Sequence, residues 1–312
     1  MLLAVRILPA QPPRTERPFA RADSLALVIP AGAASSTTAL AQWIGSQAKN
    51  ETEKARILFT WIATNITYDV QQKFSPINFY GDTQIAARAL ASRLGLCIHY
   101  AVLFCEVAEH MGLQAYTVAG QTRRETELAP AGHAWVAVRI DGQWYLMDPT
   151  WAAGGVEGLR FKKKFDDKWF MVPPDRMVRT HLPFDPQWQL QQRPVSLTAF
   201  ATGKEVATSD EVRFAYDDSI RQYLNMADWH RTLTTVRRIQ RAKAAESPDL
   251  PATARKARDE EYERHLLPIL YNRAVDDYND AVRQMNRYVE HKNRQFSPER
   301  PEAEVRGYLY AA

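Results

Sequence analysis

Cysteine is scarce in this chain, with two residues, Cys97 and Cys105, among 312. Two cysteines are too few for a disulfide framework. If both lie on one helix, their spacing of eight residues places them about 12 Å apart along its axis. A disulfide needs Cα atoms within roughly 7 Å. We therefore expect both to be free thiols.

The chain also lacks patterns that would indicate other classes of function. No run of 18 apolar residues occurs, so we expect no transmembrane segment. A glycine-rich phosphate loop, a dinucleotide fingerprint and a calcium loop of the Asp-x-Asp-x-Asp-Gly kind are all missing, which predicts no cofactor. We find no repeat of fixed period. The net charge of +4 is small for this length and does not indicate a nucleic-acid partner.

Residues 1–35 are predicted to be a leader and linker. They begin with MLLAVRILPAQ, an apolar stretch interrupted by Arg6, and continue into the proline-rich QPPRTERP. Such a beginning fits the end of a secretory signal, an edge strand or a disordered tail. We favour an exported protein, periplasmic or extracellular, over a cytoplasmic one. A short extended segment is expected at Leu25–Ile29.

Helical patterns dominate the next part of the chain. Asn50 begins a capping pattern, and the helix after it carries an apolar face. Gly95 separates a short helix from the helix that carries both cysteines, so Cys97 is expected in a first helical turn. The expected helices are Thr38–Ala48, the helix after Asn50, Thr83–Arg93 and Cys97–Met111.

Strand patterns follow these helices. Gln114–Ala119 is predicted as a strand, followed by a polar loop at Glu125–Gly132. His133–Ile140 and Gln143–Pro149 are predicted strands. Asp141-Gly142 joins them, and this dipeptide favours a type I′ hairpin turn.

Residues 191–312 are predicted to be a helical C-terminal region, after an irregular segment at Leu182–Trp188. Helical patterns cover Glu211–Lys243 and Pro268–Lys292, with a charged connector between them. In the second pattern, side chains follow one another at alternating three- and four-residue spacing: Tyr271, Ala274, Tyr278, Ala281, Met285 and Tyr288. Val282 and Val289 add to the same face. This seam is expected to pack on another helix, as a helical hairpin docked on the preceding domain.

Cys97 has the surroundings of a nucleophile. The N–H groups and the dipole at a helix start stabilise a thiolate. The backbone N–H of Cys97 is also available to an oxyanion. Attack on an amide carbonyl further requires a proton carrier and a group that orients it.

The predicted hairpin brings a histidine and an aspartate together. With Asp141-Gly142 as the turn, opposed residues have numbers that sum to 283. Side chains alternate faces along a strand, so His133, Trp135 and Asp148 project from one face. His133 and Asp148 are then diagonal neighbours, roughly 7–8 Å apart at the backbone. This arrangement predicts a Cys97-His133-Asp148 triad.

These residues resemble the motifs of the transglutaminase-like superfamily. The resemblance rests on Gly95-Leu96-Cys97, Gly132-His133-Ala134-Trp135 and the stretch from Trp144 to Trp151, in this order. The residues from Trp61 to Asp69 are similar to the helix that opens such domains. Within the superfamily, bacterial proteins of the kyphoscoliosis-peptidase type are the most similar, because they carry a segment like Thr180–Leu190.

The resemblance implies an α+β, papain-like core over residues 36–190. In such a core, the helix bearing the cysteine packs on an antiparallel sheet bearing the histidine and the aspartate, and the α-helical C-terminal extension follows. It also implies a cysteine-dependent acyl-transfer enzyme that acts on amide bonds of peptides or proteins through a thioester. Hydrolysis by a peptidase or amidase is favoured over transamidation. The alternative is a non-catalytic binding or scaffolding module.

Four further residues are candidates for the oxyanion or the substrate. Gln84 and Trp61 are possible oxyanion donors, and the sequence does not decide between them. Trp135 shares the strand face of His133, and His99 lies near the nucleophile, although a surface position is favoured for it. A zinc site of Cys97, His133 and Asp148 lacks closely spaced ligand pairs, so no metal is predicted. The oligomeric state is left open.

Overall fold

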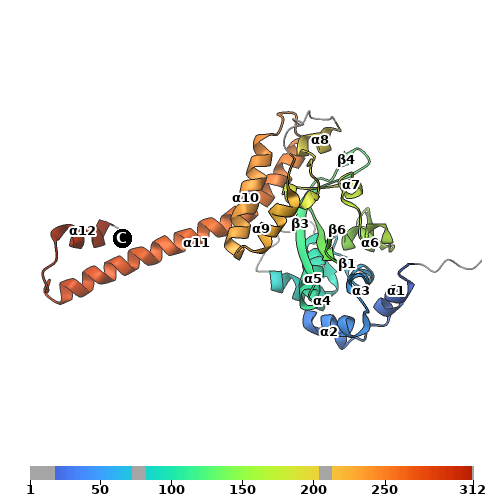
Figure 1. Ribbon diagram of the computed structural model, residues 1–312, viewed down its shortest axis with the longest axis horizontal. Coiled ribbons are helices and arrows are strands. Elements are labelled where there is room, and N and C mark those ends of the chain that lie inside the picture. Colours follow the sequence, from blue (N-terminus) through green and yellow to red (C-terminus); the bar gives the residue numbers. More distant parts are fainter. Residues whose placement is uncertain (1–17, 72–81, 204–212, 311–312) are drawn as a thin grey trace, which may run out of the picture. The chain divides into compact units, whose positions relative to one another are not determined.

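The computed structural model describes residues 18–71, 82–203 and 213–310, so the first 17 residues of the predicted leader lie outside it. Figure 1 shows the order of its helices and strands. Two compact units are present. Unit 1 comprises residues up to Val118 together with Ala134–Pro173, and unit 2 comprises Ala119–His133 together with residues from Pro174 on. Among the described residues, no helix is long and apolar enough to cross a membrane.

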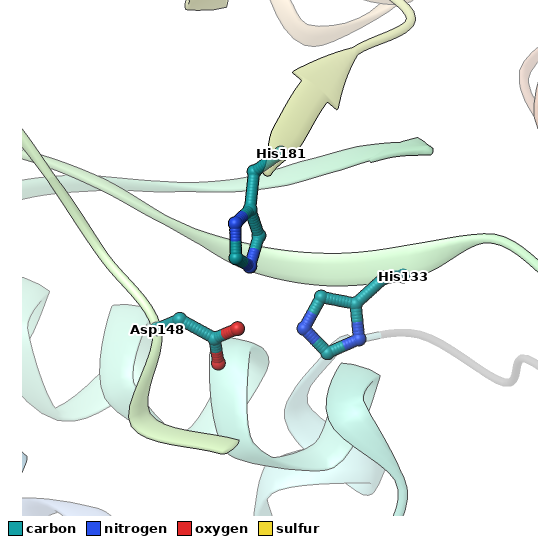
Figure 2. Close-up of side chains that lie close together, drawn as sticks. All are labelled: His133, Asp148 and His181. Carbon is teal, nitrogen blue, oxygen red and sulfur yellow. The ribbon is translucent and has the colours of Figure 1, made fainter. Parts of the chain in front are cut away.

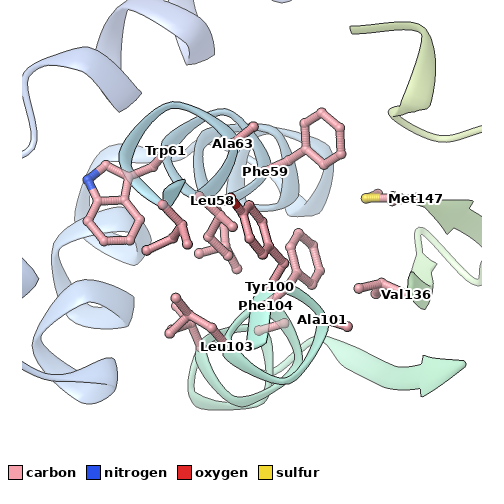
Figure 3. Close-up of a cluster of buried hydrophobic side chains, with 14 of the residues drawn as sticks. Leu58, Phe59, Trp61, Ala63, Tyr100, Ala101, Leu103, Phe104, Val136 and Met147 are labelled. Atoms are coloured by element: carbon pink, nitrogen blue, oxygen red, sulfur yellow. The ribbon is translucent and has the colours of Figure 1, made fainter. Parts of the chain in front are cut away.

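Helices of unit 1 build its core. Asn50 caps the helix Glu51–Asn65, since its Oδ1 accepts a hydrogen bond from the Glu53 N–H at 2.8 Å. Leu58 and Phe59 of that helix and Tyr100 and Phe104 of a later one belong to one apolar cluster, and all four are buried (Figure 3). The helices are α1 (Ala20–Leu27), α2 (Thr37–Gln47), α3 (Glu51–Asn65), α4 (Asp82–Ser92) and α5 (Cys97–His110). The predicted boundaries of α2, α4 and α5, and the predicted start of α3 after Asn50, agree with the structure to within one residue.

The predicted extended segment at Leu25–Ile29 is wrong, because α1 is a helix that packs on α3. Ala22 and Ala26, one turn apart, form its small buried face. Asp23 accepts two hydrogen bonds from the buried Arg56 guanidinium, at 2.6 and 2.9 Å. The ion pair with Arg56, 33 positions away in the sequence, stabilises α1 as a helix. The local pattern of apolar residues does not indicate such a distant partner.

The hairpin has the predicted register. Strands β5 (His133–Ile140) and β6 (Gln143–Met147) pair antiparallel from Ile140 opposite Gln143 to Val136 opposite Met147, and every pair sums to 283. Asp141 and Gly142 have φ of 50° and 81°, as a type I′ turn requires. The predicted register is therefore confirmed as far as Val136 and Met147, the pair next to Trp135 and Asp148.

The sheet around this hairpin is larger than the sequence predicted. Its strand order is β4-β3-β5-β6, and β9 pairs with β3. Strand β3 (Gln114–Arg124) runs five residues past its predicted end. The expected polar loop contains β4 (Glu127–Leu128), and the expected irregular segment begins with β9 (His181–Pro183). Both of these strands are too short to show a period of two, and Pro183 argues against a central strand.

Short elements complete unit 1. The 3-10 helix η1 (Ala33–Ser35) precedes α2, and β1 (Thr67–Tyr68) pairs parallel with β2 (Leu94–Gly95). The elements after β6 are α6 (Pro149–Ala153), β7 (Gly154–Glu157), β8 (Arg160–Lys163) and the 3-10 helix η3 (Asp167–Trp169).

Unit 2 is mainly helical after β9. Leu182, Phe184, Phe200 and Ile239 belong to its apolar core. The expected connector is shorter than predicted, because the last long helix begins at Ala252 and passes through Pro268. The elements are α7 (Pro174–Met177), the 3-10 helix η4 (Pro186–Gln189), α8 (Leu197–Thr202), α9 (Tyr216–Leu224), α10 (Asp228–Ala244), α11 (Ala252–Asn293) and α12 (Glu302–Tyr310).

Candidate active site

Cys97 is the first residue of α5 and is partly buried against the core of unit 1. Leu96, in extended conformation, precedes it as the N-cap. Neither Cys97 nor Cys105 forms a disulfide, as predicted. The His99 N–H bonds to the Leu96 carbonyl at 2.9 Å, and the positive end of the helix dipole lies at Cys97, where it favours a thiolate.

Gly95 is required by the way the helix begins. A Cβ added to Gly95 would lie 2.5 Å from Cβ and 2.9 Å from Cγ of His99. The His99 ring turns back over the helix start, where its Nδ1 accepts a hydrogen bond from the Leu96 N–H at 3.1 Å. Gly95 therefore allows His99 to cap the helix that presents Cys97.

His99 is buried, so the favoured surface position is wrong. Burial lowers the pKa of its imidazole, and the positive charge of Arg88 lowers it further, while Asp69 opposes the effect. The accepted hydrogen bond requires an unprotonated Nδ1, which agrees with a neutral ring. His99 also lines a cavity of about 580 Å³ with Asp69, Arg88 and Leu94. Cys97 is not among the residues found to line this cavity.

Asp148 ends the β6 side of the hairpin and is fully buried. It is the N-cap of α6, where its Oδ1 accepts hydrogen bonds from the N–H groups of Thr150 and Trp151 at 2.8 and 2.9 Å. Pro149 suits the first position of that helix because its missing N–H would have no helical partner. The cap fixes the orientation of the carboxylate.

His133 and a second histidine share the surroundings of this carboxylate (Figure 2). One ring nitrogen of His133, one of His181 and one carboxylate oxygen of Asp148 all lie within 4.8 Å of one another. The two imidazole rings have centroids 5.7 Å apart and planes inclined by 57°. Thr180 Oγ1 lies 2.8 Å from Nδ1 of the buried His181 and holds that ring in place.

These three side chains are also of the types that bind zinc. From the sequence, a zinc site of Cys97, His133 and Asp148 was considered and no metal was predicted. The structure groups His181, and not Cys97, with the other two.

Two tyrosines extend the electrostatic surroundings of Cys97 and Asp148. Burial raises the pKa of the Tyr68 phenol, and the negative charges of Cys97 and Asp148 raise it further. Burial also raises the pKa of Tyr100, with smaller contributions from Tyr68 and Asp148. Both phenols therefore keep their protons at neutral pH. Tyr68 reaches this position because it pairs with Gly95 across the short parallel ladder.

The other three candidates for the oxyanion or the substrate, Gln84, Trp61 and Trp135, lie on three different elements. Gln84 is exposed on α4. Trp61 is buried in the core of unit 1 (Figure 3), and the Arg93 guanidinium lies 4.6 Å from the centre of its ring. Trp135 is fully buried on β5. The choice between Gln84 and Trp61 as an oxyanion donor stays a prediction.

Comparison with known proteins identifies the domain around this site. Residues 38–149 match the family model of the transglutaminase-like superfamily. This part of the chain belongs to that superfamily. The transglutaminase-like domain contains Cys97, His133 and Asp148, and the predicted α+β fold with a helical C-terminal region is confirmed.

Relatives of the transglutaminase-like domain occur in much longer proteins. Mouse kyphoscoliosis peptidase is 30% identical over 169 residues, which cover 49% of this chain and 24% of that protein. The human protein is 29% identical over the same length, with the same shares. The chain thus spans about a quarter of the length of these relatives. A crystal structure of a TGase is similar to 51% of this chain and 39% of that chain, with 20% identity and a TM-score of 0.31.

Sequence reasoning missed His181 and Tyr68. Both lie inside segments that carried the family resemblance, but neither has a local signal that links it to Cys97. His181 is 48 positions from His133 in the sequence, and the three-residue strand β9 that positions it shows no recognisable pattern. Tyr68 depends on the two-residue strand β1, which is equally short.

Proposed function

We propose that the transglutaminase-like domain is a cysteine-dependent enzyme that hydrolyses amide bonds of peptides or proteins. The nucleophile is Cys97, the proton carrier is His133, and Asp148 orients and stabilises the protonated imidazole. The observation that carries this proposal is the buried, capped Asp148 carboxylate within 4.8 Å of a His133 ring nitrogen. Cys97 at the start of α5, in the same superfamily domain, supports it.

The reaction follows from these roles. His133 takes the proton of the Cys97 thiol, and the sulfur attacks the amide carbonyl carbon to form a C–S bond. The C–N bond then breaks as the imidazolium gives its proton to the leaving nitrogen, which leaves a thioester. His133 next takes a proton from water, whose oxygen attacks the thioester carbonyl. The C–S bond breaks, and the acid and the Cys97 thiolate are released.

The oxyanion formed in both attacks needs hydrogen-bond donors. The backbone N–H of Cys97 is proposed as one, because it lies at the start of a helix beside the attacking sulfur. Tyr68 is proposed as the second. Burial raises the pKa of Tyr68, and the charges of Cys97 and Asp148 raise it further, so its O–H stays a hydrogen-bond donor.

His181 is proposed as a positioning residue. Thr180 fixes its ring, and the ring lies beside those of His133 and Asp148. By occupying one side of the carboxylate, His181 limits the orientations open to His133. It does not need to exchange protons with the substrate in this role.

The two cysteines allow a matched test of hydrolysis. A peptide digest of a denatured protein is incubated with the chain, with Cys97→Ser and with Cys105→Ser, a control that makes the same change on the same helix. New amino termini and free ammonia report hydrolysis, and incorporation of a fluorescent primary amine reports transfer. We expect hydrolysis products with the parent chain and Cys105→Ser, and none with Cys97→Ser.

Other results would assign a different function. If amine incorporation exceeds hydrolysis and depends on Cys97, the domain is a transamidating enzyme. If the Cys97→Ser variant forms as much product as the parent chain, Cys97 is not the nucleophile. Binding of peptides without any product would favour a binding module.

A further inference from the structure

Helix α11 has two halves with different surroundings. Its first part packs on α10, and Ala254, Ala257 and Arg258 are buried there. Beyond Leu267 most of its large apolar side chains are exposed, with Tyr271 70% and Tyr278 69% accessible. The expectation that this seam docks on the preceding domain stays a prediction, since these side chains are exposed in the described structure.

The exposed seam is a heptad repeat. Residues 271–291 consist of three consecutive heptads, YNRAVDD, YNDAVRQ and MNRYVEH. The expectation that no fixed-period repeat occurs is wrong here. With a and d as the positions that face a partner helix, valine occupies every a position and Tyr, Tyr and Met occupy d. The a residues are Val275, Val282 and Val289, and the d residues are Tyr271, Tyr278 and Met285. All six are exposed.

Charge is excluded from the flanks of this seam. Asparagine occupies every e position, at Asn272, Asn279 and Asn286, and the g positions hold Ala274, Ala281 and Tyr288. All charged residues of the three heptads lie at positions b, c and f, on the outer face. Two such helices can meet along their seams without bringing like charges together, and the amides offer uncharged hydrogen-bond groups on both sides.

We propose that this seam, residues 271–291, binds the same seam of a second copy of this chain as a parallel two-stranded coiled coil. A strict seven-residue repeat is the pattern that keeps a seam against a partner helix. Branched residues at a favour two parallel strands. In parallel register each valine meets its own copy, and an uncharged e residue meets an uncharged g residue.

The exposed area of the seam is somewhat below that of a typical stable interface. Taking about 200 Å² for each fully exposed large side chain, the accessible fractions of the six a and d residues amount to roughly 600 Å² per chain. A stable interface buries roughly 800 Å² per partner. Three heptads are near the minimum length for a coiled coil, so we expect dissociation in the micromolar range.

A membrane surface fits this helix less well. The outer face carries Asp276, Asp277, Asp280 and Glu290 beside three arginines, whereas helices that lie on membranes have a basic polar face. The short helix α12 packs on α11 and leaves the seam open. Arg287, Glu290 and His291, which line a cavity with Tyr308 of α12, lie at f, b and c.

Sedimentation of the whole chain tests the proposal. We expect twice the mass of one chain at about 100 μM and a rising monomer fraction on dilution. Val282→Glu places a charge at the centre of the seam and should weaken self-association at least tenfold. Gln284→Glu introduces the same residue at position c and should leave it unchanged. Circular dichroism of both variants shows whether α11 stays helical.

A cysteine at a d position tests the parallel register. Met285→Cys should form an interchain disulfide on oxidation, because position 285 faces its own copy only in the parallel arrangement. The parent chain gives the background from Cys97 and Cys105. A monomer at about 100 μM, or an equal dimer with Val282→Glu, overturns the proposal. So does a monomer that binds vesicles of phosphatidylglycerol, which would make a lipid surface the partner. A dimer without the Met285→Cys cross-link overturns the parallel arrangement.

Discussion

Replacing Asp148 by asparagine separates its two roles. The Oδ1 atom caps α6 through the N–H groups of Thr150 and Trp151, and an asparagine oxygen can accept the same bonds. The negative charge beside His133 is lost in this variant. Asp148→Ala removes both the charge and the cap.

The charge has a calculable effect on the proposed thiolate–imidazolium pair. At a separation of no more than 4.8 Å and an effective dielectric constant of about 20, the carboxylate attracts a protonated His133 by on the order of 3 kcal/mol or more. Loss of this attraction corresponds to roughly a hundredfold smaller population of the pair. The cap is worth about 1 kcal/mol, or about 2–4 °C in the melting temperature of a domain of this size.

Two measurements resolve these effects. The rate at which iodoacetamide alkylates Cys97 at pH 6 is followed by mass spectrometry, with Cys105 as the internal reference, and melting is followed by calorimetry. We expect both variants to slow Cys97 alkylation roughly a hundredfold, and only Asp148→Ala to melt earlier. Alkylation of Asp148→Asn at the parent rate would refute the role given to the charge.

Three further predictions concern the support of the site. Gly95→Ala brings a Cβ within 2.5 Å of His99 and should lower the free energy of unfolding by about 1–3 kcal/mol. Gly45→Ala is its control, because a Cβ there would meet no atom within 4 Å. Urea denaturation of both variants measures the difference. Because the pKa of His99 is lowered in the folded chain, the unfolded chain binds its proton first. Stability should therefore fall as pH decreases from 6.5 through the folded value, and His99→Asn should lose that slope in urea titrations between pH 5 and 8. Asp23→Ala leaves the buried Arg56 without its main partner and should cost about 2–3 kcal/mol in the same measurement; an unchanged unfolding midpoint would mean that α1 contributes little.

The triad prediction depended on a hairpin whose register can be worked out from its turn residues. Asp141-Gly142 requires a turn with positive φ at both residues, and one turn type sets the register of both strands. With the register known, the period of two places His133 and Asp148 on one face. The start of α5 was equally readable, because Gly95 interrupts two helical patterns.

The features that were missed depend on contacts between distant segments. His181 joins Asp148 through β9, a strand of three residues that pairs with β3. Helix α1 is selected by Asp23 and Arg56, a pair that no local pattern reveals. The seam of α11 was recognised from its spacing, but whether it packs within the chain or outside it depends on where the helix lies.

The central claim is that Cys97 is activated by His133. Its most direct test is the pH dependence of Cys97 alkylation in the parent chain and in His133→Ala, read against Cys105 in the same sample. The account predicts that Cys97 reacts well below pH 8 in the parent chain, and that this reactivity at low pH disappears in the variant. A Cys97 that reacts only near pH 8.5, like an ordinary thiol, and is unaffected by His133→Ala would contradict it.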